Sequence, residues 1–231
     1  MAKKEKSEEV IGDVSIKQLD AYLKANKKDH LNYDEQVNWV ASTGSLEFDA
    51  ELGGGFGPGA YKVAGASFAG KTNCVLQCVK NALETIPNSK GLWVKAEGRL
   101  DQEVQDRSGV KFVYKAEEWQ VGTCFVLETN IFELVTDLIN NLIKNNPSEI
   151  RDVMGIDSMD GLIRRADMEK DAEEGERVGG GALLTSVMFK KANLVLNKKG
   201  HVLFMIHQIR AKIETNQDAP KDQNKSVGGG G

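Results

Sequence analysis

One stretch of eight residues has the composition needed to hold a chain of phosphates. Residues 65–72 read Gly-Ala-Ser-Phe-Ala-Gly-Lys-Thr and fit G-x-x-x-x-G-K-[ST] at every fixed position. Glycines at both ends let successive main-chain N–H groups face one point, which favours an anion. Lys71 can reach the β- and γ-phosphates of a nucleotide, and the Thr72 hydroxyl can ligate magnesium. The alternative, a glycine-rich turn with a chance lysine, is disfavoured by the apolar run before the loop and the helical pattern after it. The pattern thus predicts a site for ATP and Mg²⁺, formed by Gly65, Ala66, Ser67, Phe68, Ala69, Gly70, Lys71, Thr72 and Asn73.

Two carboxylates follow apolar runs elsewhere in the chain. Asp157 comes directly after residues 153–156, and Glu97 directly after residues 92–96. If both runs are parallel strands, both carboxylates lie at the sheet edge that carries the phosphate loop. Asp157 then becomes the second magnesium ligand beside Thr72, and Glu97 can accept a proton from attacking water. The alternatives are that Asp157 caps the next turn, that Glu97 is a solvated loop charge, and that Asp101 takes its role.

The elements around these residues alternate in type. Apolar strand patterns at 60–64, 91–96, 153–156 and 201–207 are interleaved with helical patterns at 71–83, 131–145 and 182–197. Such alternation predicts an α/β fold with a mostly parallel β-sheet and helices on both faces. A short helix over 13–27 forms a small N-terminal appendage, preceded by a charged segment, 1–12, that is expected to be disordered.

Composition narrows the functional classes. The chain has 231 residues and a net charge of −4, so any nucleic-acid site must be local. The three cysteines, Cys74, Cys78 and Cys124, form no disulfide framework and favour a reducing compartment. Cys74 and Cys78 lie four residues apart, and helix packing explains them better than a metal site. With no apolar targeting segment and no run long enough to span a bilayer, we expect a cytoplasmic protein without membrane association.

Several segments, in order, resemble a RecA-family DNA recombinase. They are residues 42–49 and 52–59 before the phosphate loop, Ala96–Asp101, Ile156–Ser158, Ile206–Ile213 and Ser226–Gly228. The short chain and its divergent loops are most similar to a phage-type member. The resemblance implies a RecA-like core in which Glu97 activates water, Lys71 binds the phosphates and Gln208 senses the γ-phosphate.

The resemblance also implies partners. The family acts in recombination and repair by coating single-stranded DNA as a helical filament, and it pairs that strand with homologous duplex DNA. Residues 160–181 and 210–227 correspond to its two DNA loops, the first with a net charge of −3 and the second mildly basic. The DNA-binding residues implied are Arg164, Arg177, Arg210 and Lys212.

The resemblance divides the chain into two parts. Residues 1–38 form an N-terminal helix and linker that would dock on a neighbouring subunit, and residues 39–231 form the ATPase core, ending at the second DNA loop. Two departures stand out: Val104 occupies a position where many relatives have an aromatic, and the sequence ends at Gly231, before the strands that follow the second loop in the family. Two alternatives therefore stay open, an ATP- and DNA-binding accessory module with little hydrolysis and a helicase-type ATPase.

Overall fold

The computed structural model describes residues 2–98, 100–168, 180–210 and 226–227, and the chain divides into two compact units, residues 1–35 and 36–231. The first unit is built on α1 (Ala2–Ala25), which runs from the second residue. The prediction of a disordered segment over 1–12 is therefore wrong, because the alanine, lysine and glutamate residues of that segment are strong helix formers. Apolar side chains of α1, including Ile16, Leu19 and Tyr22, are exposed.

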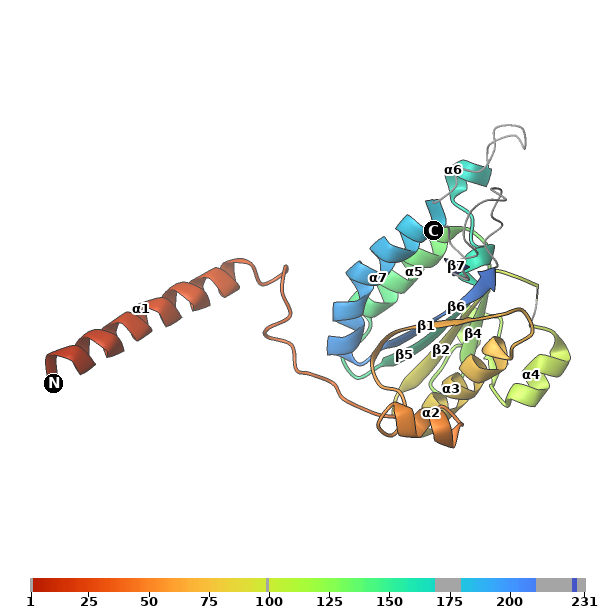
Figure 1. Ribbon diagram of the computed structural model, residues 1–231, viewed down its shortest axis with the longest axis horizontal. Coiled ribbons are helices and arrows are strands. Elements are labelled where there is room, and N and C mark those ends of the chain that lie inside the picture. The colour runs from red at the N-terminus through yellow and green to blue at the C-terminus, as the bar shows by residue number, and fades with distance from the viewer. Residues whose placement is uncertain (1, 99, 169–179, 211–225, 228–231) are drawn as a thin grey trace, which may run out of the picture. The chain divides into compact units, whose positions relative to one another are not determined.

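The second unit is an α/β structure whose order of elements confirms the predicted fold class (Figure 1). Its helices are α2 (Leu46–Glu51), α3 (Lys71–Thr85), α4 (Gln102–Ser108), α5 (Phe132–Asn145), α6 (Arg165–Met168) and α7 (Gly180–Lys199), with 3₁₀ turns η1 (Ala116–Glu118) and η2 (Met159–Gly161). Its strands are β1 (Gly59–Gly65), β2 (Ser89–Lys95), β3 (Phe112–Val113), β4 (Cys124–Glu128), β5 (Arg151–Asp157), β6 (Val202–Arg210) and β7 (Ser226–Val227).

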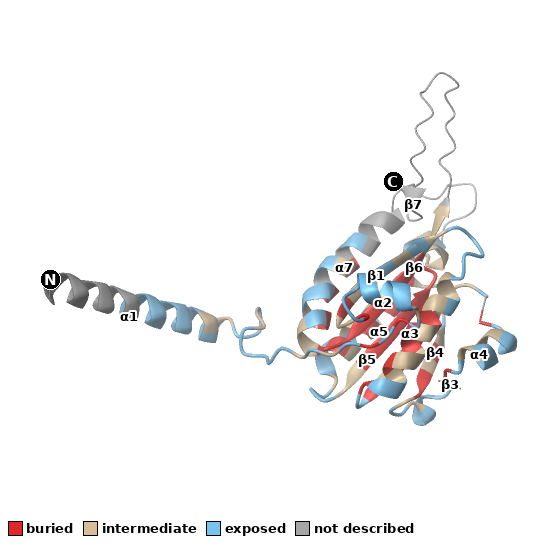
Figure 2. Cartoon of the chain, turned by 60° about the horizontal axis from the view of Figure 1, so that its bottom comes forward, coloured by how far each residue is buried: buried red, intermediate tan, exposed pale blue. Residues whose placement is uncertain are grey.

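The sheet is parallel except at one end of β6. Strands β1 to β6 lie in the order β1-β6-β5-β2-β4-β3, and every pairing along this path is parallel. The short β7 pairs antiparallel with β6. Since the connections between parallel strands must cross the sheet, helices cover its faces, with the buried residues between the layers (Figure 2).

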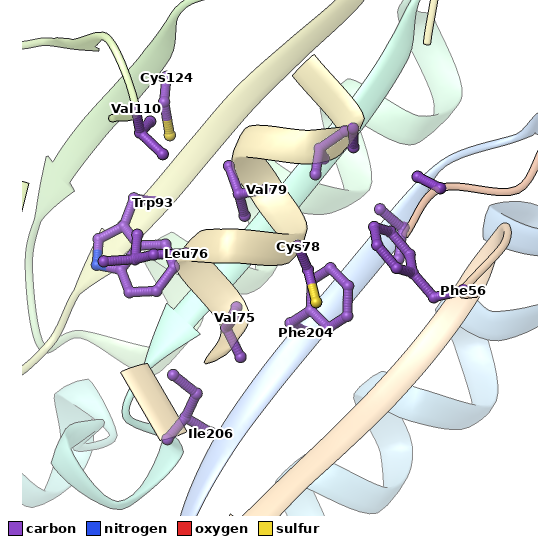
Figure 3. Close-up of a cluster of buried hydrophobic side chains, with 14 of the residues drawn as sticks. Phe56, Val75, Leu76, Cys78, Val79, Trp93, Val110, Cys124, Phe204 and Ile206 are labelled. Atoms are coloured by element: carbon purple, nitrogen blue, oxygen red, sulfur yellow. The ribbon is translucent and has the colours of Figure 1, made fainter. Parts of the chain in front are cut away.

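Strand alternation assigns each apolar side chain to one of two cores. Phe204 and Ile206 of β6 pack on the face covered by α3, whereas Leu203 and Met205 pack on the face covered by α5 and α7. Trp93 of β2 lies on the α3 side against Leu76, and its indole is fully buried (Figure 3). Burial of a ring of this size contributes about 4–6 kcal/mol of transfer free energy, so the α3 interface is a major part of what holds the phosphate loop in place.

Within the described part of the chain, no helix is both long and apolar enough to cross a bilayer.

Candidate nucleotide-binding site

Four neighbouring strands each deliver one chemically active residue to the same edge of the sheet. β1 leads into the loop that carries Lys71, β2 leads to Glu97, β5 ends at Asp157, and β6 carries Gln208. These strands are adjacent and parallel, in the order β1-β6-β5-β2, so their carboxyl ends meet. The structure thus brings together residues that are far apart in the sequence, at the edge where ligands of parallel α/β sheets bind.

The phosphate loop has the backbone geometry of a tight anion-binding turn. Gly70 caps α3 with φ of 79°, a conformation that disfavours any side chain. Phe68 also has a positive φ, 59°, although it is not a glycine, and its side chain is 95% exposed. The Lys71 ammonium donates to the carbonyl oxygens of Gly65 at 3.0 Å and Ala66 at 2.7 Å. The cation therefore lies over its own loop, where it can exchange these carbonyl contacts for phosphate oxygens.

Thr72 and Asp157 form the pair expected to hold magnesium. The Thr72 hydroxyl donates to Asp157 Oδ2 at 2.8 Å, and Asp157 is buried. Within the described residues, no group of three or more His, Cys, Asp or Glu side chains is placed to hold a metal by itself. Mg²⁺ in nucleotide sites keeps several waters and takes only one or two protein ligands together with phosphate oxygens. A hydroxyl and a carboxylate side by side fit that chemistry.

Glu97 and Gln208 are joined in one hydrogen-bonded group. The Ser158 hydroxyl donates to Glu97 Oε1 at 2.5 Å, and Gln208 Nε2 donates to Glu97 Oε2 at 3.4 Å. The Ser67 hydroxyl of the phosphate loop donates to Gln208 Oε1 at 3.4 Å. The Gln208 amide therefore bridges the phosphate loop and the carboxylate. Such an arrangement can orient a water next to a terminal phosphate and register whether that phosphate is present.

A pocket of about 440 Å³, a volume typical of small-molecule sites, is lined by Ser158 and Gln208 of this group but not by Glu97. Residues 68–73, Asp157 and Gln208 line one part of it, and Asp101, Val104 and Arg107 line another. The last three belong to α4 or to its cap, because the Asp101 carboxylate accepts from the main-chain N–H of Val104 at 2.9 Å. The pocket therefore combines a part formed by the phosphate loop with a part lined by one anionic, one aliphatic and one cationic side chain.

Comparison with known proteins places the chain among its relatives. A family model described as the RecA N-terminal domain matches residues 13–229. This chain belongs to the RecA family. It is 27% identical over 183 residues to Protein RecA of Rippkaea orientalis, an alignment covering 78% of this chain and 48% of the relative. It is 28% identical over 184 residues to Protein RecA of Mycobacterium ulcerans, covering 79% of this chain and 49% of the relative.

The chain spans about half the length of the curated RecA relatives it matches. Among solved structures, the RadB recombinase is 22% identical, with a TM-score of 0.48 and coverage of 76% of this chain and 73% of that one.

The DNA-binding residues implied by the RecA resemblance are only partly placed. Arg164 lies just before α6, where its guanidinium pairs with the Asp167 carboxylate. Arg210 is the last residue of β6, and its side chain lies outside the described part of the structure. Arg177 and Lys212 also lie outside the described residues. Of these four side chains, the structure therefore describes that of Arg164 alone.

Two residues of the candidate nucleotide-binding site, Ser158 and Arg107, were not predicted from the sequence. Ser158 holds Glu97, and its position directly after the strand-end Asp157 could have indicated it. Arg107 lines the pocket with Val104, and their spacing of three residues places both on one side of α4. Gln208 was expected to follow a strand. It lies within β6 instead, because it is still paired with Gly65 of β1 and the strand continues to Arg210.

The thiol of Cys74, on the first turn of α3, is expected to react selectively. A hydrogen bond with Cys78 lowers the pKa of Cys74 to about 7, whereas that bond and burial raise the pKa of Cys78, and burial raises the pKa of Cys124. Thiolate, the reactive form, increases as the pH rises through the pKa. We therefore expect iodoacetamide to alkylate Cys74 first in the native protein, with a half-maximal rate near pH 7.

Peptide mapping of the alkylated protein across pH measures this reactivity. In a Cys78→Ala control, the Cys74 midpoint should move toward the ordinary value of 9.0. Equal labelling of all three cysteines, or an unchanged midpoint in the control, would contradict the assignment.

Proposed function

We propose that this RecA-family chain binds ATP with Mg²⁺ and hydrolyses it in response to single-stranded DNA. The observation that carries the proposal is the bridge made by Gln208, whose side chain contacts Ser67 in the phosphate loop and Glu97 at the end of β2. This contact supports the proposal, because Gln208 is then the phosphate sensor that we propose and Glu97, beside it, is the proposed proton acceptor. A nucleotide-binding module without hydrolysis has no need for this contact.

Each residue then has a distinct task. Lys71 binds the β- and γ-phosphates, and Thr72 and Asp157 hold Mg²⁺, which neutralises phosphate charge when it is bound. Glu97 accepts the proton of the attacking water, with Ser158 fixing the carboxylate. Gln208 contacts the γ-phosphate and begins the segment that leads to the second DNA loop. Arg164, Arg177, Arg210 and Lys212 are the proposed DNA contacts.

In the cell, we propose, the chain forms a helical filament on single-stranded DNA and pairs it with homologous duplex DNA in recombination and repair. Residues 1–38 dock on the next subunit, while residues 39–231 form the ATPase core. The exposed apolar side chains of α1 support this docking role, since a neighbouring subunit would bury them. Deletion of residues 1–38 should abolish filaments but leave ATP binding intact.

The proposal is tested by the rate of ATP hydrolysis measured with and without single-stranded DNA. We expect DNA to raise the turnover, and a Lys71→Ala control identifies any contaminating ATPase. Tight ATP binding without DNA-dependent turnover would instead favour the accessory-module alternative. The Arg164–Asp167 pair supports that second candidate, because an arginine neutralised by a carboxylate contributes less to phosphate binding. A closed ring in particle images would favour a helicase-type motor.

A further inference from the structure

Strand β6 extends beyond its neighbour β5 at the nucleotide edge. The β5–β6 pairing ends at Ile156 and Met205, whereas β6 continues to Arg210. β5 provides no partner for β6 after Met205, and the short β7 pairs only with Ile209 and Arg210 in the described residues. Unpaired main-chain N–H groups at partly buried positions are costly, so another acceptor is needed there.

Asp160 supplies that acceptor. Its carboxylate Oδ2 accepts a hydrogen bond from the main-chain N–H of Gln208 at 2.8 Å. A bond between a carboxylate and an N–H is charge-assisted and stronger than the amide–carbonyl bond that a strand would have provided. The last part of β6 is thus fixed by a side chain of η2, the turn that directly follows β5.

The same turn also contacts the carboxylate proposed to activate water. Ser158, next to η2, donates to Glu97, and Gly161 within it lies so close that an added Cβ would be 2.8 Å from Glu97 Cγ and 3.0 Å from the Ala96 carbonyl oxygen. η2 therefore touches Glu97 on one side and the main chain of Gln208 on the other. The turn is thus in contact with both residues.

We propose that Asp160 is a positioning residue that holds Gln208 in register with Glu97 and so couples the nucleotide site to the segment after β6. The inference rests on the proposed function, because the coupling it describes is between ATP hydrolysis and DNA. Asp160 acts through the main chain of Gln208. The side chain of Gln208 is then left free to contact Ser67, Glu97 and a terminal phosphate.

The test compares Asp160→Ala with Asp160→Asn. Alanine removes the acceptor, so we expect DNA-stimulated kcat to fall at least about 10-fold, the factor that corresponds to the loss of one charge-assisted hydrogen bond. The Kd for ATP should change less than about 3-fold, because Asp160 bonds to β6 and not to the phosphate loop. Asparagine keeps an acceptor oxygen and should restore most of the stimulation. Asp137→Ala, which removes an exposed carboxylate of α5, should match the wild type.

Hydrogen–deuterium exchange of the peptide covering the end of β6 gives a readout independent of activity. Exchange there should accelerate about 10-fold in the alanine variant and stay at the wild-type rate in the asparagine variant. If the wild type shows no DNA-stimulated turnover, the proposed function fails, and the exchange comparison still decides whether Asp160 anchors Gln208. Wild-type exchange and turnover in Asp160→Ala would overturn the inference. So would equal losses of ATP affinity and melting temperature in both variants.

Discussion

Replacing Glu97 with glutamine is expected to lower the rate of ATP hydrolysis by roughly 10²- to 10⁴-fold, the usual contribution of a positioned general base. ATP affinity should change little, because the substitution keeps the shape of the side chain and removes only its ability to take a proton. Ser158 and Gln208 both donate to this carboxylate, and a glutamine at this position can still accept one of the two bonds. Steady-state hydrolysis with DNA, beside an equilibrium ATP titration, measures both quantities.

The matched control for this substitution is Glu128→Gln. Glu128 also ends a strand, β4, at the same edge of the sheet, where it pairs with Lys95 at 2.8 Å. Glu97 differs from it by bonding to Ser158 and Gln208, both of which line the pocket. We expect the control variant to hydrolyse ATP at the wild-type rate. Unchanged hydrolysis in Glu97→Gln would exclude Glu97 as the general base. Asp101, which lines the pocket, would then be the remaining candidate.

Replacing Lys71 with alanine is expected to weaken ATP binding roughly 10- to 100-fold, the factor that corresponds to a lost hydrogen bond to a charged group. Among the described residues, the Lys71 ammonium bonds to two main-chain carbonyls of the phosphate loop, those of Gly65 and Ala66. Its removal should therefore affect nucleotide affinity far more than the melting temperature. Calorimetric titration with ATP and Mg²⁺ measures the affinity.

Lys80→Ala provides the control, since Lys80 lies on the same helix, α3, and pairs with Glu84 at the surface. It removes the same charge from α3 without touching the pocket, so its ATP affinity should equal that of the wild type. A Lys71→Ala variant that binds ATP normally would show that the loop does not hold phosphates.

The sequence predicted the parts of the site that depend on local pattern. The phosphate loop is specified by fixed residue types, and the apolar runs before Glu97 and Asp157 placed both carboxylates at strand ends. β5 was predicted too short because Asp152 interrupts its apolar run. The structure buries that carboxylate with two hydrogen bonds from Asn146 Nδ2, at 2.9 and 2.8 Å, so a charged residue occupies a core strand position.

Contacts that depend on tertiary neighbours could not be predicted. Nothing in the periodicity around Asp160 indicates that its carboxylate meets a main-chain N–H on β6, because that contact requires β6 to extend past β5. Arg107 is similar: its place in the pocket depends on where α4 lies relative to the phosphate loop. Gln208 was predicted from the resemblance to the RecA family, and its contact with Glu97 links β6 to the residues that follow β2.

The four site residues come from four adjacent strands, so the complete site exists only in the folded sheet. A ligand that contacts Lys71, Glu97, Asp157 and Gln208 at once binds only when β1, β2, β5 and β6 are all assembled. Their pairings are non-local, so they are among the slow steps of chain assembly, and no partly folded form offers the complete site. Ligand binding then stabilises the native unit as a whole, by about 2.7 kcal/mol at a ligand concentration 100 times Kd. For the nucleotide proposed above, its concentration would therefore affect the stability of the folded unit as well as the rate of hydrolysis.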